Sequence, residues 1–597
     1  MTFEFYYVTQ QKTSSFPAQN RRGRRQPQRR QHHRYPQSIK AGVLKIIPLG
    51  GMEEVGRNMT VFEYGDDIVI LDMGLQFPEE DMPGIDFIIP NISYLKGKEK
   101  NIRGVIFSHG HLDHIGAAPI LLKELGYPPI IGRDLTIALV KKRLEDYEEK
   151  SIKNLKVIRI NSTEDRMNLG QFRIGFFNVE HSIMDAIGVI LNTPSGTIIH
   201  PGDWTMEKNP RNHLPITYNH LANLPRPKIL MLESLGATDL RQSITTEEEM
   251  YANLEKLITE ATGKVIIATF SSQIRRIGHI LEFASQIGKQ VALDGYSMKI
   301  NVEIAKELGY IKVPKKTLIS VKDLHKYPEN KIIVLCTGAQ GEGNAVLSRI
   351  MTGEHKYIKI RKQDTIVFSS SVIPGNERTI QRLKDSLYRQ CDNVIHNDIM
   401  DVHTSGHSNA ESIKEIIRQI KPDYFLPVYA NHFFLKEAAK LAIQIGFPRD
   451  KIFVLDNGSI LEFHGQQAPR INAKKTDASY VFVDGLGVGD IGQIVLRDRQ
   501  MMAGDGMFVV IAIIDSQTCK VKNSPDIISR GFIYMRESKE LLAEVRKKVR
   551  QIVEETTMAG HPINWTYVKD NIRDKIGKFL YNKTQRRPMV LPVVIEV

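Results

Sequence analysis

The feature that most constrains the fold is a string of metal-capable side chains directly after an apolar run. The run Gly104-Val105-Ile106-Phe107 is followed by Ser108-His109-Gly110-His111-Leu112-Asp113-His114. Packing does not explain three imidazoles and a carboxylate at the end of one predicted strand, whereas a metal site needs such groups on a rigid edge. The string therefore predicts the floor of a metal centre, built where a sheet meets a loop.

Further potential ligands sit at the ends of other predicted strands. Strands are expected at residues 44–51, 67–72, 102–108, 172–179, 186–191 and 197–200. Asp72 closes the second of these strands, His181 follows the fourth, and Asp203 follows the last. Taken singly, His181 or His200 favours an ordinary core or surface histidine. Loops that leave rigid sheets are nevertheless where proteins present chemistry, so we expect some of these side chains to meet.

The spacing of the string allows two ions to share one site. A turn after the strand can direct His109 and His111 to one ion, and Asp113 with His114 to a second ion on its other side. Ions in two-metal sites lie about 3.5–4 Å apart and share ligands. Asp203 is a carboxylate of the type that such a bridge requires.

Length and cysteine content indicate a multidomain protein of a reducing compartment. A chain of 597 residues with 42% hydrophobic residues is too long for one core, so about three to four domains are expected. Cys336, Cys391 and Cys519 are widely spaced and form no C-x-x-C pair, which argues against a disulfide scaffold. No apolar run approaches the roughly 20 residues of a membrane helix, and the N-terminus has no apolar signal-peptide core. We expect a soluble, cytoplasmic protein with no membrane partner.

Positive charge is concentrated at the N-terminus. Residues 1–40 hold seven arginines, two lysines and one glutamate, and the whole chain has a net charge of +13. This segment lacks apolar periodicity, so we predict a disordered basic arm. Its functional interpretation is binding to a polyanion, most simply RNA, through release of counterions. A solvated tail that aids solubility or docks on an acidic protein is the alternative, and a transit peptide is disfavoured because the segment is not amphipathic.

Longer motifs place these residues in a family context. Asp72, the 109–114 string, His181-Ser182-Ile183-Met184-Asp185 and Gly202-Asp203-Trp204 resemble the successive motifs of the metallo-β-lactamase fold. The resemblance is narrowed by Pro48-Leu49-Gly50-Gly51-Met52-Glu53-Glu54-Val55-Gly56-Arg57-Asn58, Cys336-Thr337-Gly338-Ala339-Gln340-Gly341-Glu342, Ser371-Val372-Ile373-Pro374-Gly375-Asn376-Glu377 and Thr404-Ser405-Gly406-His407. With 483–490, 525–532 and 586–589, these segments make the chain similar to the ribonuclease J family of β-CASP nucleases over nearly all of residues 41–597.

The resemblance implies an α/β architecture in several parts. A metallo-β-lactamase αββα sandwich is expected at 41–245 and again at 393–465, interrupted by an inserted β-CASP α/β domain at 246–392. A linker at 466–478 would lead to a small α/β C-terminal domain at 479–597, with the basic arm at 1–40. RNA would lie in the cleft between the first two domains.

The resemblance also implies a role for each candidate ligand. One ion would be held by His109, His111 and His181, and the other by Asp113 and His114. Asp203 would bridge the two ions. Two divalent ions are implied, with Zn²⁺ expected and Mn²⁺ or Mg²⁺ as alternatives.

Three further residues complete the implied catalytic set, beside Asp113. Asp72 would orient the cluster from behind the ligands. Glu233 matches the first acidic motif of the β-CASP group, and His407 matches the second, histidine-containing one. A carboxylate bonded to the imidazole would keep it protonated, so that His407 can act as a general acid toward the leaving 3′ oxygen.

One position departs from the family pattern. Family members place a histidine within a Pro-Val-His-Gly stretch to complete the second ion's ligands, whereas this chain has Pro427-Val428-Tyr429-Ala430-Asn431-His432. Either Tyr429 lines the site without binding metal, or water fills the place, or His432 reaches in. We favour the first two together, because a shift of three residues re-aims a side chain. The second ion is then expected to bind more weakly.

The middle of the chain is expected to handle the RNA. Residues 264–272 predict a strand followed by a loop, residues 331–337 predict a strand, and the glycine-rich 338–343 precedes a predicted helix. Such a loop can cradle a phosphate, but alone it favours a structural tight turn. As the resemblance implies, the RNA channel and its 5′-phosphate pocket would be lined, with His407, by Arg275, Arg276, Ser370, Ser371, Ser405 and Gly406.

Two tempting motifs are given structural interpretations. Gly485-x-Gly487-x-Gly489 precedes the apolar run 491–496, which we predict to be a strand, so a turn is favoured over a dinucleotide fingerprint. The charged segment 537–555 predicts a solvated helix that contributes to self-association.

The function expected from the resemblance is hydrolysis of RNA phosphodiester bonds. Both 5′-to-3′ exonuclease and endonuclease activity are implied, in RNA maturation, including that of rRNA, and in mRNA decay. RNA is the expected partner, with a homodimer or homotetramer and an RNA-decay or ribosome-associated assembly. Two alternatives stay open: a hydrolase of small esters or thioesters, which would need neither insertion nor arm, and a catalytically weak RNA-binding subunit, which would suit Tyr429.

Overall fold

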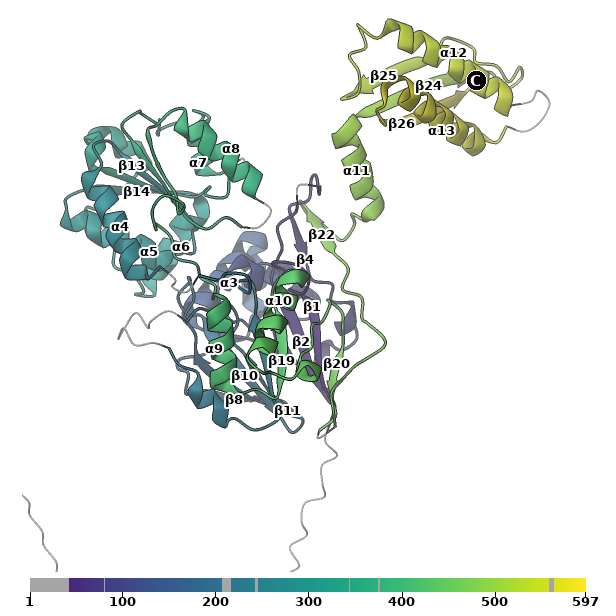
Figure 1. Cartoon of the computed structure of the whole chain (residues 1–597). Coiled ribbons are helices and arrows are strands. Elements are labelled where there is room, and N and C mark those ends of the chain that lie inside the picture. The colour runs from purple at the N-terminus through teal and green to yellow at the C-terminus, as the bar shows by residue number, and fades with distance from the viewer. Residues whose placement is uncertain are drawn as a thin grey trace, which may run out of the picture. The chain divides into compact units, whose positions relative to one another are not determined.

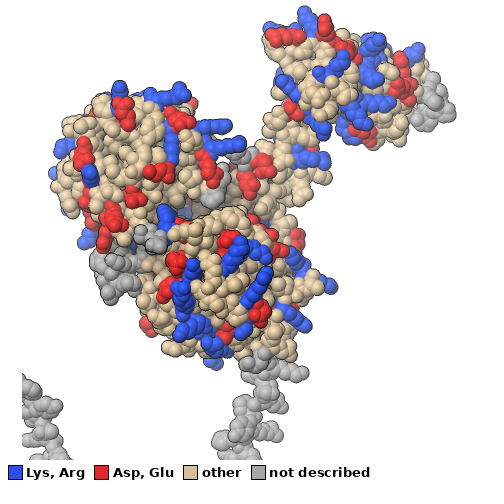
Figure 2. Space-filling view, viewed as in Figure 1, with Lys and Arg blue, Asp and Glu red and all other residues tan. Residues whose placement is uncertain are grey.

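The computed structural model describes residues 42–79, 81–206, 216–241, 245–342, 344–373, 376–465, 467–557 and 563–597. The predicted basic arm lies outside these residues. Within them, no helix is long and apolar enough to cross a membrane. On the face shown in Figure 2, basic and acidic side chains are interspersed over the described part of the chain.

An eight-stranded sheet carries the predicted metal-ligand string. Its strand order is β21-β20-β1-β2-β3-β5-β6-β7; β1, β2 and β20 are labelled in Figure 1. The strands are β1 (Leu44–Gly50), β2 (Met59–Tyr64), β3 (Asp67–Leu71), β5 (Ile102–Ile106), β6 (Ile130–Gly132), β7 (Val157–Arg159), β20 (Leu461–Phe463) and β21 (Arg470–Ile471). Strands β3, β5, β6 and β7 are parallel, so their carboxyl ends share one edge. Asp72 and the 109–114 string leave the sheet at that edge.

A second, six-stranded sheet presents the remaining predicted site residues. Its order is β19-β12-β11-β10-β9-β8. The strands are β8 (Arg166–Leu169), β9 (Phe172–Asn178), β10 (Ile187–Thr193), β11 (Gly196–His200), β12 (Lys228–Glu233) and β19 (Tyr424–Val428). Because β11, β12 and β19 are parallel, Asp203, Glu233 and Tyr429 emerge at the same edge.

The two sheets pack face to face with helices outside. Successive residues of a strand face opposite sides of its sheet. In β3, Val69 and Leu71 join the core between the sheets, whereas Ile68 and Ile70 join the core under the helices. The helices are α2 (Ala118–Glu124) and α3 (Asp134–Tyr147) over the first sheet, and α9 (Ala410–Ile420) and α10 (His432–Gln444) over the second. The layer order is the αββα sandwich expected from the sequence.

A third sheet of six parallel strands forms the insertion, in the order β15-β14-β16-β13-β17-β18. The strands are β13 (Val265–Thr269), β14 (Gln290–Asp294), β15 (Leu318–Ile319), β16 (Ile332–Cys336), β17 (Thr365–Ser369) and β18 (Asn393–Ile395). Helices cover both faces: α4 (Glu247–Glu260), α5 (Ile274–Gln286) and α6 (Tyr296–Glu307) on one, α7 (Val346–Met351) and α8 (Glu377–Tyr388) on the other. The sheet extends past residue 392, the predicted limit, because β18 pairs with β17.

The glycine-rich segment after β16 forms tight turns. Gly338 and Gly341 adopt φ values of +107° and +78°, and the Gly341 N–H donates to the Gly338 carbonyl over 3.1 Å. This is the structural interpretation that the sequence favoured for the loop.

The C-terminal sheet has the order β25-β24-β26. Its strands are β24 (Met507–Ile514), β25 (Asp526–Arg530) and β26 (Met589–Glu596), packed against α12 (Lys539–Thr556) and α13 (Trp565–Thr584). Helix α12 confirms the helix predicted at 537–555.

The strand predicted at 491–496 is wrong, because α11 (Gln493–Asp505) begins there. A short apolar run does not distinguish helix from strand, and Ile494 and Val495 are exposed rather than buried as a core strand requires. Of the preceding glycines, Gly485 lies in the turn between β22 (Val481–Asp484) and β23 (Gly487–Val488), Gly487 begins β23 and Gly489 follows it. Strand β22 also pairs with β4 (Phe87–Ile89), and β21, inside the predicted linker, pairs with β20.

Backbone hydrogen bonds tie the 109–114 string to the loop after β3. Met73 and Leu75 donate N–H bonds to the carbonyls of His114 and Leu112, at 2.8 and 3.0 Å. Gly74 lies between them, and a Cβ added there would approach the Asp113 carbonyl oxygen to 1.6 Å. Only glycine allows this approach of two backbones.

We predict that Gly74→Ala lowers the free energy of unfolding by about 1–3 kcal/mol, because the added methyl must displace the turn that carries Asp113. Chemical denaturation monitored by circular dichroism measures the change. Gly577→Ala in α13 is the matched control, since a Cβ there meets nothing within 4 Å, and equal stability of the two variants would contradict the prediction.

Candidate metal centre

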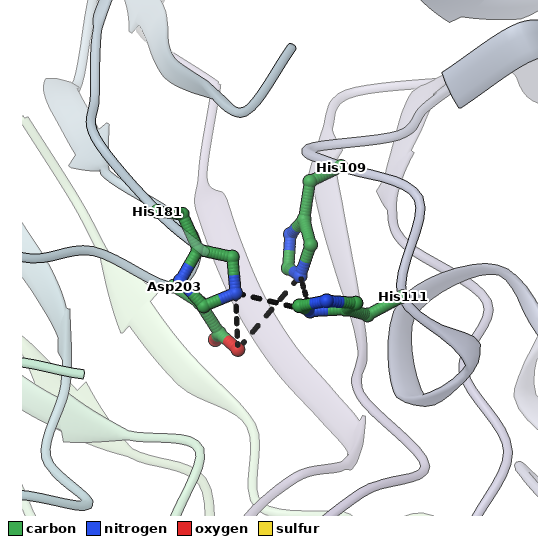
Figure 3. Close-up of side chains that lie close together, drawn as sticks. All are labelled: His109, His111, His181 and Asp203. Atoms are coloured by element: carbon green, nitrogen blue, oxygen red, sulfur yellow. Dashed lines mark hydrogen bonds and ion pairs between the residues drawn. The ribbon is translucent and has the colours of Figure 1, made fainter. Parts of the chain in front are cut away.

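Three imidazoles converge at the edge where the two sheets meet. His109 follows β5, His111 precedes the short helix α1 (Leu112–Ile115), and His181 follows β9. The Nδ1 atom of His111 lies 3.1 Å from His109 Nε2 and 3.0 Å from His181 Nε2 (Figure 3). Two nitrogens bound to one zinc ion at about 2.0–2.1 Å lie about 3.3 Å apart, so the spacing fits a common ion.

Asp203 connects this group to a second one. Its Oδ2 atom lies 3.8 Å from both His109 Nε2 and His181 Nε2. Its Oδ1 atom lies 3.3 Å from Nε2 of His114, which is 3.4 Å from Asp113 Oδ2. Each oxygen of one carboxylate therefore faces a different group, as a bridging ligand requires.

Asp72 lies behind the ligands rather than among them. This fully buried carboxylate accepts hydrogen bonds from His114 Nδ1, the Ser108 backbone N–H and Ser108 Oγ, each at 2.8 Å. Ser108 Oγ lies 3.0 Å from His109 Nδ1. Asp72 thus orients one imidazole directly and a second through Ser108, in the arrangement seen behind metal-bound histidines.

The neutral imidazoles of the first group and the carboxylates of the second suit cation binding. Burial lowers the pKa of His111 to about 4 and that of His181 to about 3, so both are neutral, the form that binds metal. Burial also opposes charge on His114, but Asp203, Asp113 and Asp72 outweigh it and raise its pKa well above the usual value. Three carboxylates crowded around one imidazole call for positive charge, which a divalent ion supplies.

Glu233 and His407 form a pair beside the first group. Glu233 Oε2 lies 3.6 Å from His407 Nδ1, and the His407 ring meets His181 edge-on with centroids 5.5 Å apart. Burial lowers the pKa of His407, but Glu233 outweighs it and raises that pKa to about 9. The imidazole is therefore protonated at neutral pH.

Tyr429 stands beside the second group. Its side chain is 3% exposed, and its ring centroid lies 5.5 Å from that of His114 and 5.0 Å from that of His200. Burial, with the charges of Asp72 and Asp203, raises the pKa of Tyr429 well above its usual range, so the phenol keeps its proton.

His432 lies in a different cluster from the second group. Its Nδ1 atom is 3.8 Å from Glu53 Oε1 and 3.9 Å from Asp456 Oδ1, on an exposed part of the surface. The structure thus separates His432 from Asp113 and His114, against the interpretation in which it reaches in.

The residues expected to bind RNA have protein partners here. Arg275 forms ion pairs with Glu247 at 3.2 Å and Glu180 at 3.5 Å. Arg276 is buried and donates to the Ser369 carbonyl, to Ser369 Oγ and to Thr404 Oγ1, and it also contacts His403 Nδ1. These contacts hold elements together, and phosphate binding by either guanidinium stays a prediction.

The serines and glycine of the expected RNA channel lie in two loops. Ser370 and Ser371 follow β17, and the Ser371 carbonyl accepts a 2.7 Å bond from Gln340 of the glycine-rich segment. Ser405 Oγ accepts from the His407 N–H, and the Gly406 carbonyl accepts from His181 Nδ1 at 2.6 Å. Their contact with RNA stays a prediction.

Sequence reasoning missed three residues that touch the ligands. Asn58 Nδ2 lies 3.3 Å from Asp113 Oδ2 and 3.0 Å from His114 Nε2. Ser108 and Ser272 contact His109 and His111, the latter at 3.1 Å. All three lie in segments already recognised as motifs or loops, but a hydroxyl or an amide carries no metal-ligand pattern by itself.

Sequence profiles of three families match this chain. "Metallo-beta-lactamase superfamily" matches residues 52–235, "Ribonuclease J, beta-CASP domain" matches 262–387, and "Ribonuclease J C-terminal domain" matches 494–597. Together they confirm the predicted fold class. Each matched range lies inside one predicted segment, although the predicted domain boundaries stay predictions.

Characterised relatives match almost end to end. Ribonuclease J2 of Bacillus subtilis (strain 168) is 35% identical, covering 93% of this chain and 99% of the relative. Ribonuclease J 1 of Streptococcus pyogenes serotype M3 is 35% identical, with coverages of 94% and 98%. Ribonuclease J 2 of Staphylococcus aureus (strain MRSA252) is 34% identical, with coverages of 93% and 98%. The chain therefore belongs to the ribonuclease J family and is a metal-dependent ribonuclease of the metallo-β-lactamase fold.

Proposed function

We propose that this ribonuclease cleaves RNA at the centre formed by His109, His111, His181 and Asp203, both as a 5′-to-3′ exonuclease and as an endonuclease. The observation that carries the proposal is the meeting of these four side chains within 4.8 Å of one another, with Asp203 shared by a second group. RNA maturation, including that of rRNA, and mRNA decay are the processes that such an activity serves.

Each group of residues has a defined part in the proposed reaction. Divalent ions held by these residues would supply Lewis acidity, which would stabilise negative charge on the phosphate and lower the pKa of a bound water. Asp72 holds His114 in place and, through Ser108, also His109. His407, kept protonated by Glu233, holds the proton that the leaving 3′ oxygen requires.

We propose two divalent ions of unequal affinity, with Zn²⁺ in the complete group. Three imidazole nitrogens and a carboxylate suit zinc. The second group offers Asp113, His114 and Asp203, while the adjacent Tyr429 is a protonated phenol. Mn²⁺ or Mg²⁺ are the alternatives there, because they accept oxygen ligands and water.

The proposed setting is the cytoplasm, where RNA is the partner. The three cysteines are free and buried, which suits a reducing compartment. We also propose a homodimer or homotetramer, and association with an RNA-decay or ribosome-bound assembly.

The first prediction from the proposed function is metal-dependent cleavage of 5′-monophosphorylated RNA. The purified chain with Mn²⁺ or Zn²⁺ is expected to release products, whereas an Asp113→Ala/His114→Ala variant loses at least about 10³-fold in rate, since it lacks most of the second group. Product lengths on a gel distinguish exonuclease from endonuclease action.

A catalytically weak RNA-binding subunit is the second candidate, favoured by Tyr429 alone. It predicts retained RNA binding with no metal-dependent cleavage by the parent chain. That result in the same assay would overturn the proposed enzyme function.

The second prediction concerns Tyr429. Tyr429→His is expected to tighten the second ion by about 10-fold or more, because an imidazole replaces a phenol that keeps its proton. Metal content after dialysis against a series of free-metal concentrations measures the change. Tyr429→Phe is the matched control, and an equal stoichiometry for all three proteins would count against a weakened second group.

The third prediction concerns the basic arm. Deleting residues 1–40, which contain seven arginines, is expected to weaken RNA binding and to reduce the slope of log affinity against log salt, since fewer counterions are released. Fluorescence anisotropy over a salt series provides the slope. An unchanged slope would show that the arm does not contact RNA.

A further inference from the structure

Each imidazole of the centre is anchored through the nitrogen that faces away from the other ligands. His109 Nδ1 contacts Ser108 Oγ at 3.0 Å, His114 Nδ1 contacts Asp72 at 2.8 Å, and His181 Nδ1 contacts the Gly406 carbonyl at 2.6 Å. These three anchors lie outside the inserted sheet, in segments that the sandwich itself supplies.

His111 differs from the other three imidazoles in the nitrogen that faces the group and in the domain that supplies its partner. It faces the group with Nδ1, so its outer nitrogen is Nε2. That nitrogen lies 3.1 Å from Ser272 Oγ. Ser272 belongs to the loop between β13 and α5 of the inserted sheet, within the range matched by the β-CASP profile.

The loop that carries Ser272 is held firmly by its own domain. The Gln273 N–H donates to the Phe270 carbonyl over 3.1 Å, and α5 begins directly afterwards at Ile274. Asn301 of α6 donates its side-chain amide to the Ser271 carbonyl at 2.9 Å. The hydroxyl is therefore presented to His111 by a turn that two helices of the insertion brace.

The chemistry of the contact has one consistent arrangement. For Nδ1 of His111 to offer its lone pair to an ion, Nε2 must carry the proton and donate it to the serine oxygen. This hydrogen bond holds the ring plane and raises the basicity of the ligand nitrogen. Losing such a partner behind a metal-bound histidine typically costs about 10–100-fold in metal affinity.

We propose that Ser272 is a positioning residue for His111, through which the inserted domain sets the affinity of the sandwich for its first divalent ion. The proposal rests on the proposed function in that the three-imidazole group binds an ion. It deepens that function, because the hydrogen-bond partner of one candidate ligand comes from outside the fold that bears the metal motifs. Displacement of the insertion would then weaken binding of the ion.

The test measures zinc affinity of the full-length chain by competition with a chromophoric chelator. Ser272→Ala is expected to weaken the tighter zinc site by about 10-fold or more, and Ser272→Thr to restore it. Ser272→Val, which has the shape of threonine without the hydroxyl, is expected to behave like the alanine variant. Ser271→Ala, one residue away, is the control expected to leave the affinity unchanged.

A second variant tests the contact between Ser272 and His111 without changing Ser272. Asn301→Ala removes the brace on the loop and is expected to weaken zinc binding by a smaller factor than Ser272→Ala. Thermal unfolding of the metal-free proteins shows whether each variant is folded. If Ser272→Ala does not fold, Asn301→Ala and the comparison of Ser272→Thr with Ser272→Val decide.

The outcomes separate this inference from the proposed function. If the parent binds no zinc, the proposed centre itself fails. If the parent binds and cleaves RNA but the alanine, valine and threonine variants share its zinc affinity, only the positioning role of Ser272 is overturned. A loss that threonine does not restore would likewise overturn it, since the hydroxyl would not be the operative group.

Discussion

The buried carboxylate of Asp72 is the constraint on which the centre depends. A charge with no exposure to water is tolerated only when strong donors surround it. Three hydrogen bonds do so, two from Ser108 and one from His114, and all come from the string that follows the neighbouring strand. Asp72, directly after β3, thereby fixes the course of the whole ligand segment. Its φ of +63° turns the backbone toward that segment.

The site is assembled from chain ends of parallel strands. The first sheet supplies the 109–114 string, whereas the second supplies Asp203 and Glu233 from adjacent strands. Because the two sheets pack over a shared apolar core, the residues that follow their strands meet at one site. The long loop containing His407 returns after the insertion, and its Gly406 carbonyl anchors His181. The insertion then touches the ligands through Ser272.

Local patterns predicted much of this arrangement, and pairing partners explain the exceptions. The spacing of His109, His111, Asp113 and His114 contains the chemistry within a few residues, so no tertiary knowledge is needed to recognise it. The apolar run at 491–496 has no such internal signature, and its helix was predicted as a strand. Strand β18 exists through pairing with β17 on the other side of helix α8, which short-range patterns do not encode. Strand β21 pairs with the preceding strand β20 but has only two residues, too few for a recognisable pattern.

By itself, the sequence determined the identity and spacing of the ligand string. Through the family resemblance it also predicted roles for Asp203, for the Glu233 and His407 pair, and for Tyr429 where an imidazole was expected. Only the tertiary structure decided which of their atoms meet, because ring orientation depends on partners as far as 225 positions away. The structure places Arg275 and Arg276 in contact with protein groups rather than on a charged surface. It also brought Ser272 to His111, since a hydroxyl acquires its role from the group that it faces.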